Sequence, residues 1–230
     1  MGKTGALIGT FVVLFALAAA TLSAQAPPAP AERFVVVLDA AHGGDDSGAR
    51  LNNEAEKAYT LAFSVRLRSL LMARGIAVVT TRESDASLDP DRRAEIANHA
   101  NAQACLSLHA SESGSGVHLF VSSLAPARPA LFLPWKTAQA AWIPRSLSMA
   151  GVLNSALTQA GITVTLGRIG LPAIDSMTCP AVAIEIAPER SSDASGSAGL
   201  DDPDYQSRVA KALAAALVEW RSTNTGGQQP

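Results

Sequence analysis

Charged and aromatic residues are scarce in this sequence of 230 residues. Asp, Glu, Lys and Arg make up 17% of it, and Phe, Trp and Tyr only 5%. No extended run of Lys or Arg occurs, and the formal net charge is −2. These absences argue against a nucleic-acid-binding protein, because that class normally carries a basic stripe. No internal repeat is present, and the apolar fraction of 48% is ample for the core of one domain.

One long apolar run is present, at residues 6–20 (ALIGTFVVLFALAAA). Lys3 precedes it, and residues 24–26 (AQA) have the small-x-small pattern of a signal-peptidase site. We therefore predict a signal peptide over residues 1–26. The alternative is an uncleaved N-terminal anchor, since the run approaches the roughly 20 residues that span a bilayer. In either case we expect an exported protein, located in the periplasm or cell envelope.

Changes in composition set the expected domain boundaries. Residues 27–32 (PPAPAE) are predicted to be a stiff linker. Residues 33–222 are expected to form one domain. Residues 223–230 (TNTGGQQP) have no apolar side chain to bury, so we expect a disordered tail.

Only two cysteines are present, Cys105 and Cys179, and each precedes a short apolar run. In an exported protein they could pair as a disulfide. They could equally be two small buried thiols. The sequence does not decide between these states, because pairing depends on geometry.

Short apolar runs alternate with helical patterns along the rest of the chain. We expect strands at residues 34–38, 76–80, 104–108, 116–121 and 181–186. We expect helices ending near residues 75 and 160 and helices over residues 91–101 and 203–220. This alternation predicts an α/β fold: a single domain with a mainly parallel or mixed twisted sheet and helices on both faces.

The first predicted helix has recognisable signals at its start. Asn52 or Asn53 is expected to cap it, with Glu54 and Glu56 in its first turn. Its apolar positions predict the buried face, which would comprise Leu61, Val65, Leu67, Leu70 and Leu71.

Three polar residues follow or end predicted strands: His42, His109 and Glu185. The carboxyl ends of parallel strands lie at one edge of a sheet, so these side chains can converge there. Two histidines and a carboxylate, with a fourth position open, are a common ligand set of hydrolytic zinc, and a further carboxylate is needed as the base. The chain can supply His42, Glu56 and His109 as ligands and Glu185 as the catalytic base.

Each of these residues also has a structural explanation. His42 and His109 can be ordinary loop and strand-end histidines, and Glu56 can complement the positive end of a helix dipole. Glu185 is the hardest to explain in this way. Its neighbours are apolar, and Glu is rarely buried unless it is paired.

Four motifs in order carry a family resemblance: residues 38–49 (LDAAHGGDDSGA), Glu56-Lys57, residues 106–110 (LSLHA) and residues 180–186 (PAVAIEI). Over about residues 34–220, the chain resembles the zinc-dependent N-acetylmuramoyl-L-alanine amidases of bacterial cell walls. The resemblance implies one Zn²⁺ and hydrolysis of the amide between N-acetylmuramic acid and L-alanine in peptidoglycan. The resemblance also implies that His42, Glu56 and His109 are the zinc ligands and that Glu185 is the catalytic carboxylate.

Two positions depart from the pattern of this family, and a second glutamate is an alternative candidate for one of the ligands. Ala41 stands where a Gly usually precedes the first histidine, which is tolerable if its φ is negative. After Glu185 the chain reads IAPER, so the adjacent substrate-binding loop is expected to differ. Glu54 is a rival of Glu56 as ligand but lacks the following Lys.

Residues 131–146 (LFLPWKTAQAAWIPRS) contain Trp135 and Trp142, which lie on one face if the segment is helical. The segment is either a helix packed on the sheet or a lid beside the zinc on which an activator protein acts. His118 is out of phase with the apolar residues of its strand, so we expect it to face solvent, although it could reach the site. His99 is expected at the surface.

Two other functions are compatible with the sequence. A zinc peptidase of the carboxypeptidase type would share the ligands and would need a carboxylate-binding arginine, for which Arg168 or Arg190 is available. A non-catalytic peptidoglycan-binding regulator would keep the fold without turnover. For the amidase, we expect peptidoglycan as the substrate, no nucleic acid, and a monomer.

Overall fold

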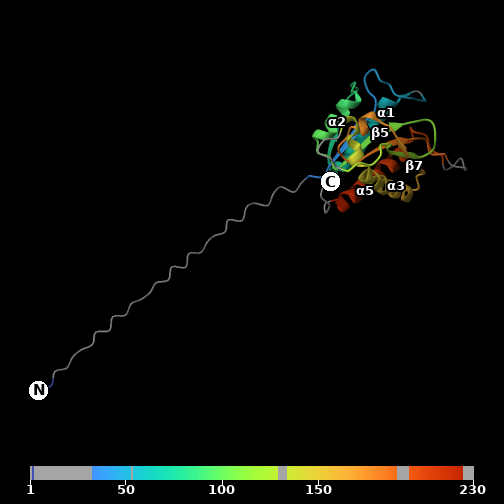
Figure 1. The fold of residues 1–230 in the computed structure, drawn as a ribbon. Helices are drawn as coiled ribbons and strands as arrows, with labels where there is room; N and C mark the ends of the chain where they lie inside the picture. The colour runs from blue at the N-terminus through green and yellow to red at the C-terminus, as the bar shows by residue number, and fades with distance from the viewer. Residues whose placement is uncertain (1, 3–32, 53, 129–133, 191–196, 225–230) are drawn as a thin grey trace. The chain divides into compact units, whose positions relative to one another are not determined.

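The computed structural model describes residues 2, 33–52, 54–128, 134–190 and 197–224 (Figure 1). The predicted signal peptide and linker, apart from Gly2, lie outside these residues, as do most of the predicted tail and residues 131–133 of the tryptophan-containing segment. Within the described residues, no helix has both the length and the apolar character needed to cross a bilayer.

A mixed six-stranded sheet lies at the centre of the domain, in the order β4-β1-β5-β8-β6-β7. Its strands are β1 (Val35–Ala40), β4 (Ala77–Thr80), β5 (Ala104–Ala110), β6 (Val117–Ser122), β7 (Val164–Ile169) and β8 (Ala181–Ile186). Strands β4, β1, β5 and β8 are parallel, whereas β6 is antiparallel to β8 and β7 is parallel to β6. The predicted α/β fold with a mixed sheet is confirmed.

One face of the sheet carries large apolar side chains, such as Leu38, Leu106 and Ile184. Successive residues of a strand point to opposite faces, so these side chains lie together. The three longest helices cover them: α1 (Glu56–Met72), α3 (Ile143–Gln159) and α5 (Pro203–Asn224). Figure 1 shows α3 and α5 side by side on this face.

The opposite face carries smaller side chains, such as Ala181 and Ala183. Shorter elements cover it: α2 (Pro90–His99), α4 (Pro172–Asp175) and the 3₁₀ helix η1 (Trp135–Ala141). Near the carboxyl ends of β5 and β8 this cover is incomplete, and His109 and Glu185 are only half-buried. A ligand or metal site can therefore form at this uncovered end of β5 and β8.

The start of α1 differs from the prediction. Strands β2 (Arg50–Leu51) and β3 (Glu54–Ala55) form a short antiparallel hairpin, and Asn52, with φ of 49°, lies in its turn and does not cap the helix. Asn accepts this left-handed conformation more readily than most residues. The helix begins at Glu56, directly after the hairpin, and has no side-chain cap.

The buried face of α1 also differs from the predicted one. Tyr59, Phe63, Leu67 and Leu71 are buried at intervals of four residues, which places them on one face of the helix. Val65 is predicted to belong to this face, but it is 53% exposed. The predicted set combines positions from two sides of the helix.

The segment that contains Trp135 and Trp142 is not one continuous helix. Thr137 has a non-helical backbone within η1, and α3 begins only after Trp142. The seven-residue spacing therefore does not place the two indoles on a common helical face. Strand β7 and helix α4 are further elements that the sequence reasoning missed, since β7 is a largely exposed edge strand and α4 has only four residues.

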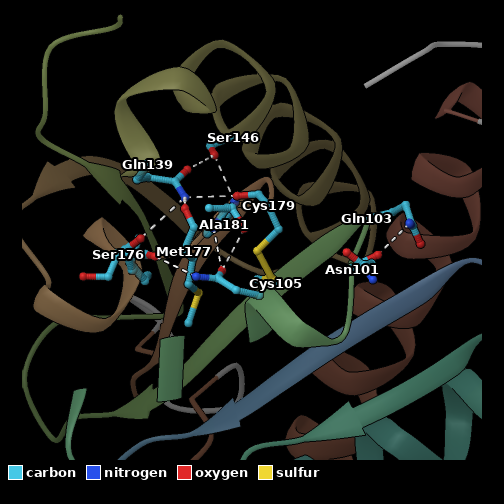
Figure 2. Close-up of a disulfide and its surroundings, with 12 residues drawn as sticks. Asn101, Gln103, Cys105, Gln139, Ser146, Ser176, Met177, Cys179 and Ala181 are labelled. Carbon is cyan, nitrogen blue, oxygen red and sulfur yellow. Dashed lines mark hydrogen bonds between the residues drawn. A yellow bond between two sulfur atoms is a disulfide. The ribbon is translucent and has the colours of Figure 1, made fainter. Parts of the chain in front are cut away.

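Cys105 on β5 and Cys179, just before β8, form a disulfide bond (Figure 2). Their Cα atoms are 6.3 Å apart, a distance within the usual range for disulfides. The bond joins the amino-terminal ends of the two strands that carry His109 and Glu185. The choice left open by the sequence is thereby decided in favour of pairing.

Gln139 of η1 anchors the same region (Figure 2). Its Nε2 donates to the carbonyl oxygen of Cys179 at 3.0 Å, and its Oε1 accepts a 2.7 Å hydrogen bond from Ser146 Oγ. Ser146 Oγ in turn accepts from the backbone N–H of Ala181 at 2.9 Å. Both side chains are fully buried, so this part of the segment supports the start of β8.

Candidate metal centre

Two strands and one loop bring the histidines and Glu185 to the same end of the sheet. His109 is the next-to-last residue of β5, and its register partner on β8 is Glu185. Side chains at paired positions share a face, so these two stand side by side. His42 lies two residues beyond the end of β1.

The loop after β1 has a conformation that depends on glycine. His42 itself has φ of 63°, and three glycines that follow it also have positive φ, a region that Gly enters at little cost. At Gly48, a Cβ would lie 2.6 Å from Cδ2 of His42 and 2.7 Å from Oε2 of Glu56. Gly48 therefore permits the loop to close around both side chains. Ala41 has no positive φ, so the missing glycine there is tolerated.

His42, Glu56 and His109 form one cluster, in which one ligand atom of each lies within 4.8 Å of the others. Nε2 of His42 is 3.1 Å from Oε2 of Glu56, and Nδ1 of His109 is 3.2 Å from Oε1 of the same carboxylate. The two imidazole rings are nearly perpendicular, with centroids 5.4 Å apart. Glu54, the rival of Glu56, is exposed on β3 and lies outside the cluster.

Glu56 is buried at the start of α1, yet it is held as a carboxylate. Burial by itself favours the neutral acid. The contacts with the imidazoles of His109 and His42 outweigh this effect, and the backbone N–H groups of Ala49 and Ala110 donate to the two oxygens at 2.9 and 3.0 Å. Together they hold the pKa of Glu56 well below its usual range. This shift favours the carboxylate form of Glu56.

Asp46 fixes the orientation of His42. Its Oδ2 lies 2.9 Å from Nδ1 of His42, and its Oδ1 accepts a 3.0 Å hydrogen bond from the N–H of Gly48. The hydrogen bonds with Glu56 and with Asp46 raise the pKa of His42, although burial opposes them. The same contact with His42 lowers the pKa of Asp46. A carboxylate on the outer nitrogen of a histidine is the usual way to set its tautomer for metal binding.

The donor atoms of this cluster fit a divalent cation. When neutral His42 donates from Nδ1 to Asp46, its Nε2 carries a lone pair that faces an oxygen of Glu56 only 3.1 Å away. Two acceptors at this distance repel unless a proton or a cation lies between them. Two imidazoles and one carboxylate are also a standard protein ligand set for such an ion. The three side chains together can therefore hold one metal ion.

Two buried arginines, Arg82 and Arg93, fix the backbone that carries His42. Arg93 donates to the carbonyl oxygens of Ala40 and His42 at 2.8 and 2.7 Å and forms a 2.7 Å ion pair with Asp39. Arg82 donates to the carbonyl oxygen of Ala40 at 2.9 Å. Sequence reasoning did not single out these residues, because charged side chains are rarely buried and their partners lie far away in the chain.

Glu185 is paired with His118, and the expectation that His118 faces solvent is wrong. Nδ1 of His118 lies 3.0 Å from Oε1 of Glu185. The two residues are register partners across the antiparallel strands β6 and β8. The sequence signal for this pair is the odd phase of the histidine in its strand, but only the sheet order identifies its neighbour.

A cleft of about 180 Å³ opens beside the cluster. Its lining combines candidate site residues with apolar residues at the start of α2 and around α4: Asp39, Ala41, His42, Asp46, Leu88, Pro90, Arg93, Ser107, His109, Leu171, Pro172, Ala173 and Ile174. Arg168 and Arg190, considered for a peptidase pocket, are engaged elsewhere. Arg168 donates to the carbonyl oxygens of Ser122 and Leu124, and Arg190 to that of Glu112.

The sequence profile of the Amidase_3 family, described as N-acetylmuramoyl-L-alanine amidase, matches residues 36–219. A germination-specific N-acetylmuramoyl-L-alanine amidase of Bacillus subtilis is 33% identical over 94 residues, which are 35% of this chain and 40% of that protein. The chain spans less than half the length of the curated relatives that it matches.

Solved structures of N-acetylmuramoyl-L-alanine amidases are similar to this chain over a larger part of its length than the curated sequences are. The catalytic domain of CwlV, an N-acetylmuramoyl-L-alanine amidase from Bacillus (Paenibacillus) polymyxa var. colistinus, superposes with a TM-score of 0.64 and 30% identity. The alignment covers 82% of this chain and 98% of that domain. The CwlD amidase of Clostridioides difficile, solved in complex with the GerS lipoprotein, shares the fold with a TM-score of 0.63 and 21% identity, covering 84% of this chain and 100% of CwlD.

Proposed function

The chain belongs to the N-acetylmuramoyl-L-alanine amidase family, and we propose on this basis that it hydrolyses the amide bond between the lactyl group of N-acetylmuramic acid and L-alanine in peptidoglycan. The observation that carries the proposal is the convergence of His42, Glu56 and His109 beside Glu185. Such a set of groups is what metal-assisted amide hydrolysis requires.

The proposed cofactor is one zinc ion held by His42, His109 and the carboxylate of Glu56. When bound, zinc lowers the pKa of a coordinated water to about 7 and polarises the carbonyl group under attack. The protein contributes the negative charge of Glu56, whose two oxygens are fixed by the backbone N–H groups of Ala49 and Ala110. These two hydrogen bonds fix both carboxylate oxygens beside the two histidines.

Glu185 is proposed as the general base. It stands beside His109 in the sheet register and is half-buried, so it can reach a water molecule at the cluster while remaining accessible to substrate. In this role Glu185 takes a proton from the attacking water and passes it to the leaving amine of L-alanine. A positioned acid–base group of this kind contributes about 10²- to 10⁴-fold to the rate.

The cleft beside the cluster is proposed to orient the scissile bond. Leu88 and Pro90 form part of its wall from the start of α2, and Leu171, Pro172 and Ala173 contribute from around α4. Apolar walls with polar groups at one end are typical of small-ligand sites. The methyl groups of the lactyl and alanyl units are proposed to pack against these walls.

The proposed setting is the cell envelope, since the substrate lies outside the cytoplasmic membrane and residues 1–26 have the pattern of an export signal. We also propose that an activator protein acts on the segment 131–146, at the exposed side chain of Trp135. Trp135 is 44% exposed there, and the CwlD amidase, which shares the fold, forms a complex with a lipoprotein. We propose a monomeric catalytic unit.

Product analysis distinguishes this function from the alternatives. The purified protein is loaded with zinc and incubated with peptidoglycan, and the soluble products are identified by mass spectrometry. Free stem peptides with an N-terminal L-alanine are expected. Shortened stem peptides would indicate a peptidase, and binding without any product would indicate a non-catalytic regulator. The matched control is Glu185→Gln, which should retain zinc and lose about 100-fold or more in turnover.

A further inference from the structure

The carboxylate of Glu185 has a single hydrogen-bond partner in the described part of the chain, the imidazole of His118. Nδ1 of His118 lies 3.0 Å from Oε1 of the carboxylate. Glu56, in contrast, accepts from two backbone N–H groups in addition to its histidine contacts. Among the described residues, one side chain therefore orients the Glu185 carboxylate.

The sheet register places this pair directly beside the metal cluster. His109, Glu185 and His118 are register partners across β5, β8 and β6. Their side chains form a row on one face of the sheet, with Glu185 in the middle. From this position, Glu185 can direct one oxygen toward a group bound near His109 while the other oxygen is held by His118.

The imidazole of His118 is itself confined. It lies edge-on to Phe120, with ring centroids 6.3 Å apart. A Cβ on Gly114 would lie 2.2 Å from Cε1 of His118, so the glycine lets the preceding loop lie against the ring. The side chain of His118 is 15% exposed and that of Glu185 32%. His118 is thus more buried than Glu185, whose carboxylate it contacts.

We propose that His118 is a positioning residue for Glu185, a role that rests on the proposed function of Glu185 as the general base. A neutral imidazole has one N–H, and when the proton is on Nδ1 the ring donates to Oε1 of Glu185. Oε2 is then the oxygen that accepts the proton of the attacking water. A base must lie within hydrogen-bond reach of the proton that it removes, so loss of this orientation lowers turnover without altering the metal ligands.

Three variants test the proposal in the zinc-loaded full-length protein. His118→Phe keeps the ring shape but has no donor. His118→Asn keeps an N–H close to the position of Nδ1. His99→Phe is the matched control, because His99 is an exposed histidine at the end of α2 and does not belong to the row on β5, β8 and β6. The readouts are kcat and KM on a defined muropeptide, zinc content and the thermal midpoint.

We expect His118→Phe to lower kcat by about 10- to 100-fold, as for a misplaced catalytic group, with zinc content and KM nearly unchanged. His118→Asn should recover most of the lost turnover, and His99→Phe should behave as the wild type. In a Glu185→Gln background, His118→Phe should have little further effect, because both changes act on one group. Full turnover of His118→Phe, or equal losses for His118→Phe and His118→Asn, would overturn the proposal.

A measurement without turnover separates this proposal from the proposed function. Long-range ¹H–¹⁵N NMR spectra identify which nitrogen of His118 carries the proton in the wild-type protein and in Glu185→Leu. We expect the proton on Nδ1 in the wild type and a changed tautomer equilibrium in the variant. A proton on Nε2 in the wild type would overturn the role of His118 even if the enzyme is active. An inactive wild type with the expected tautomer would instead reject the proposed function.

Discussion

The disulfide between Cys105 and Cys179 gives a stability prediction that can be worked out from the structure. The two residues are separated by 74 positions in the sequence. In the chain-entropy description, cross-linking a loop of this length removes about 15 cal/mol/K from the unfolded ensemble, or about 4.5 kcal/mol at 25 °C. Cys105→Ala/Cys179→Ala should therefore lower the free energy of unfolding by about 2–4 kcal/mol, since measured values often fall below the entropic limit.

We expect the hydrogen bonds around the disulfide to keep the folded state intact in the double variant. Gln139 and Ser146 still bind the carbonyl oxygen of Cys179 and the N–H of Ala181 when the sulfur atoms are absent, because these are backbone contacts. The loss should thus arise mainly in the unfolded state. Turnover at 25 °C should remain close to that of the wild type, while the thermal midpoint falls by about 2–4 °C per kcal/mol.

Urea denaturation followed by circular dichroism measures the change. The control is wild-type protein reduced in urea and refolded under reducing conditions, which should match the double alanine variant. Both half-cystines are buried, so reductant added to the folded protein should act only slowly. A loss of stability below about 1 kcal/mol, or no difference between reduced and oxidised wild type, would refute the reasoning, because loop closure predicts several times that value.

Three further changes test the candidate metal centre and its support. Asp46→Asn should weaken zinc binding by about 10- to 100-fold, because it removes the carboxylate that orients a ligand histidine; titration against a chelator measures this, and unchanged affinity would contradict the assigned role. Gly48→Ala should abolish zinc binding, since the new methyl would lie 2.6 Å from an imidazole atom and 2.7 Å from a carboxylate oxygen of the cluster. Gly151→Ala is its control, with no atom within 4 Å, and zinc content of the two variants should differ sharply. Arg93→Met should destabilise the fold by about 3–5 kcal/mol, because it leaves the buried Asp39 without its cationic partner; a urea midpoint equal to that of the wild type would show that the ion pair is dispensable.

The positions of His42, His109 and Glu185 at the ends of strands follow from the sequence for a physical reason. A buried strand that breaks into a polar, glycine-rich loop is a local signal, and this signal alone marks His42 as a candidate site residue. His109 and Glu185 end or nearly end apolar runs in the same way, and parallel strand order brings such ends together. Fold class follows from the same alternation of strand and helix patterns.

The errors concern features that depend on neighbours distant in the sequence. Asn is a common helix-capping residue, but Asn52 lies in the turn of the hairpin that β2 and β3 form. Val65 has helical spacing with other apolar residues, yet the sheet meets the side of α1 that carries Phe63. His118 can be assigned to its partner only once β6 is known to lie antiparallel beside β8. In each case the local sequence pattern predicts one environment for the residue. The observed environment is set by strands or helices that are distant in the sequence.

The central claim is that His42, Glu56 and His109 hold one zinc ion beside Glu185. Anomalous diffraction at the zinc absorption edge, from crystals of the zinc-loaded protein, tests it most directly. We predict one strong peak at about 2.0–2.2 Å from Nε2 of His42, Nδ1 of His109 and an oxygen of Glu56. A peak at another place, or a folded protein that takes up no zinc, would contradict the claim.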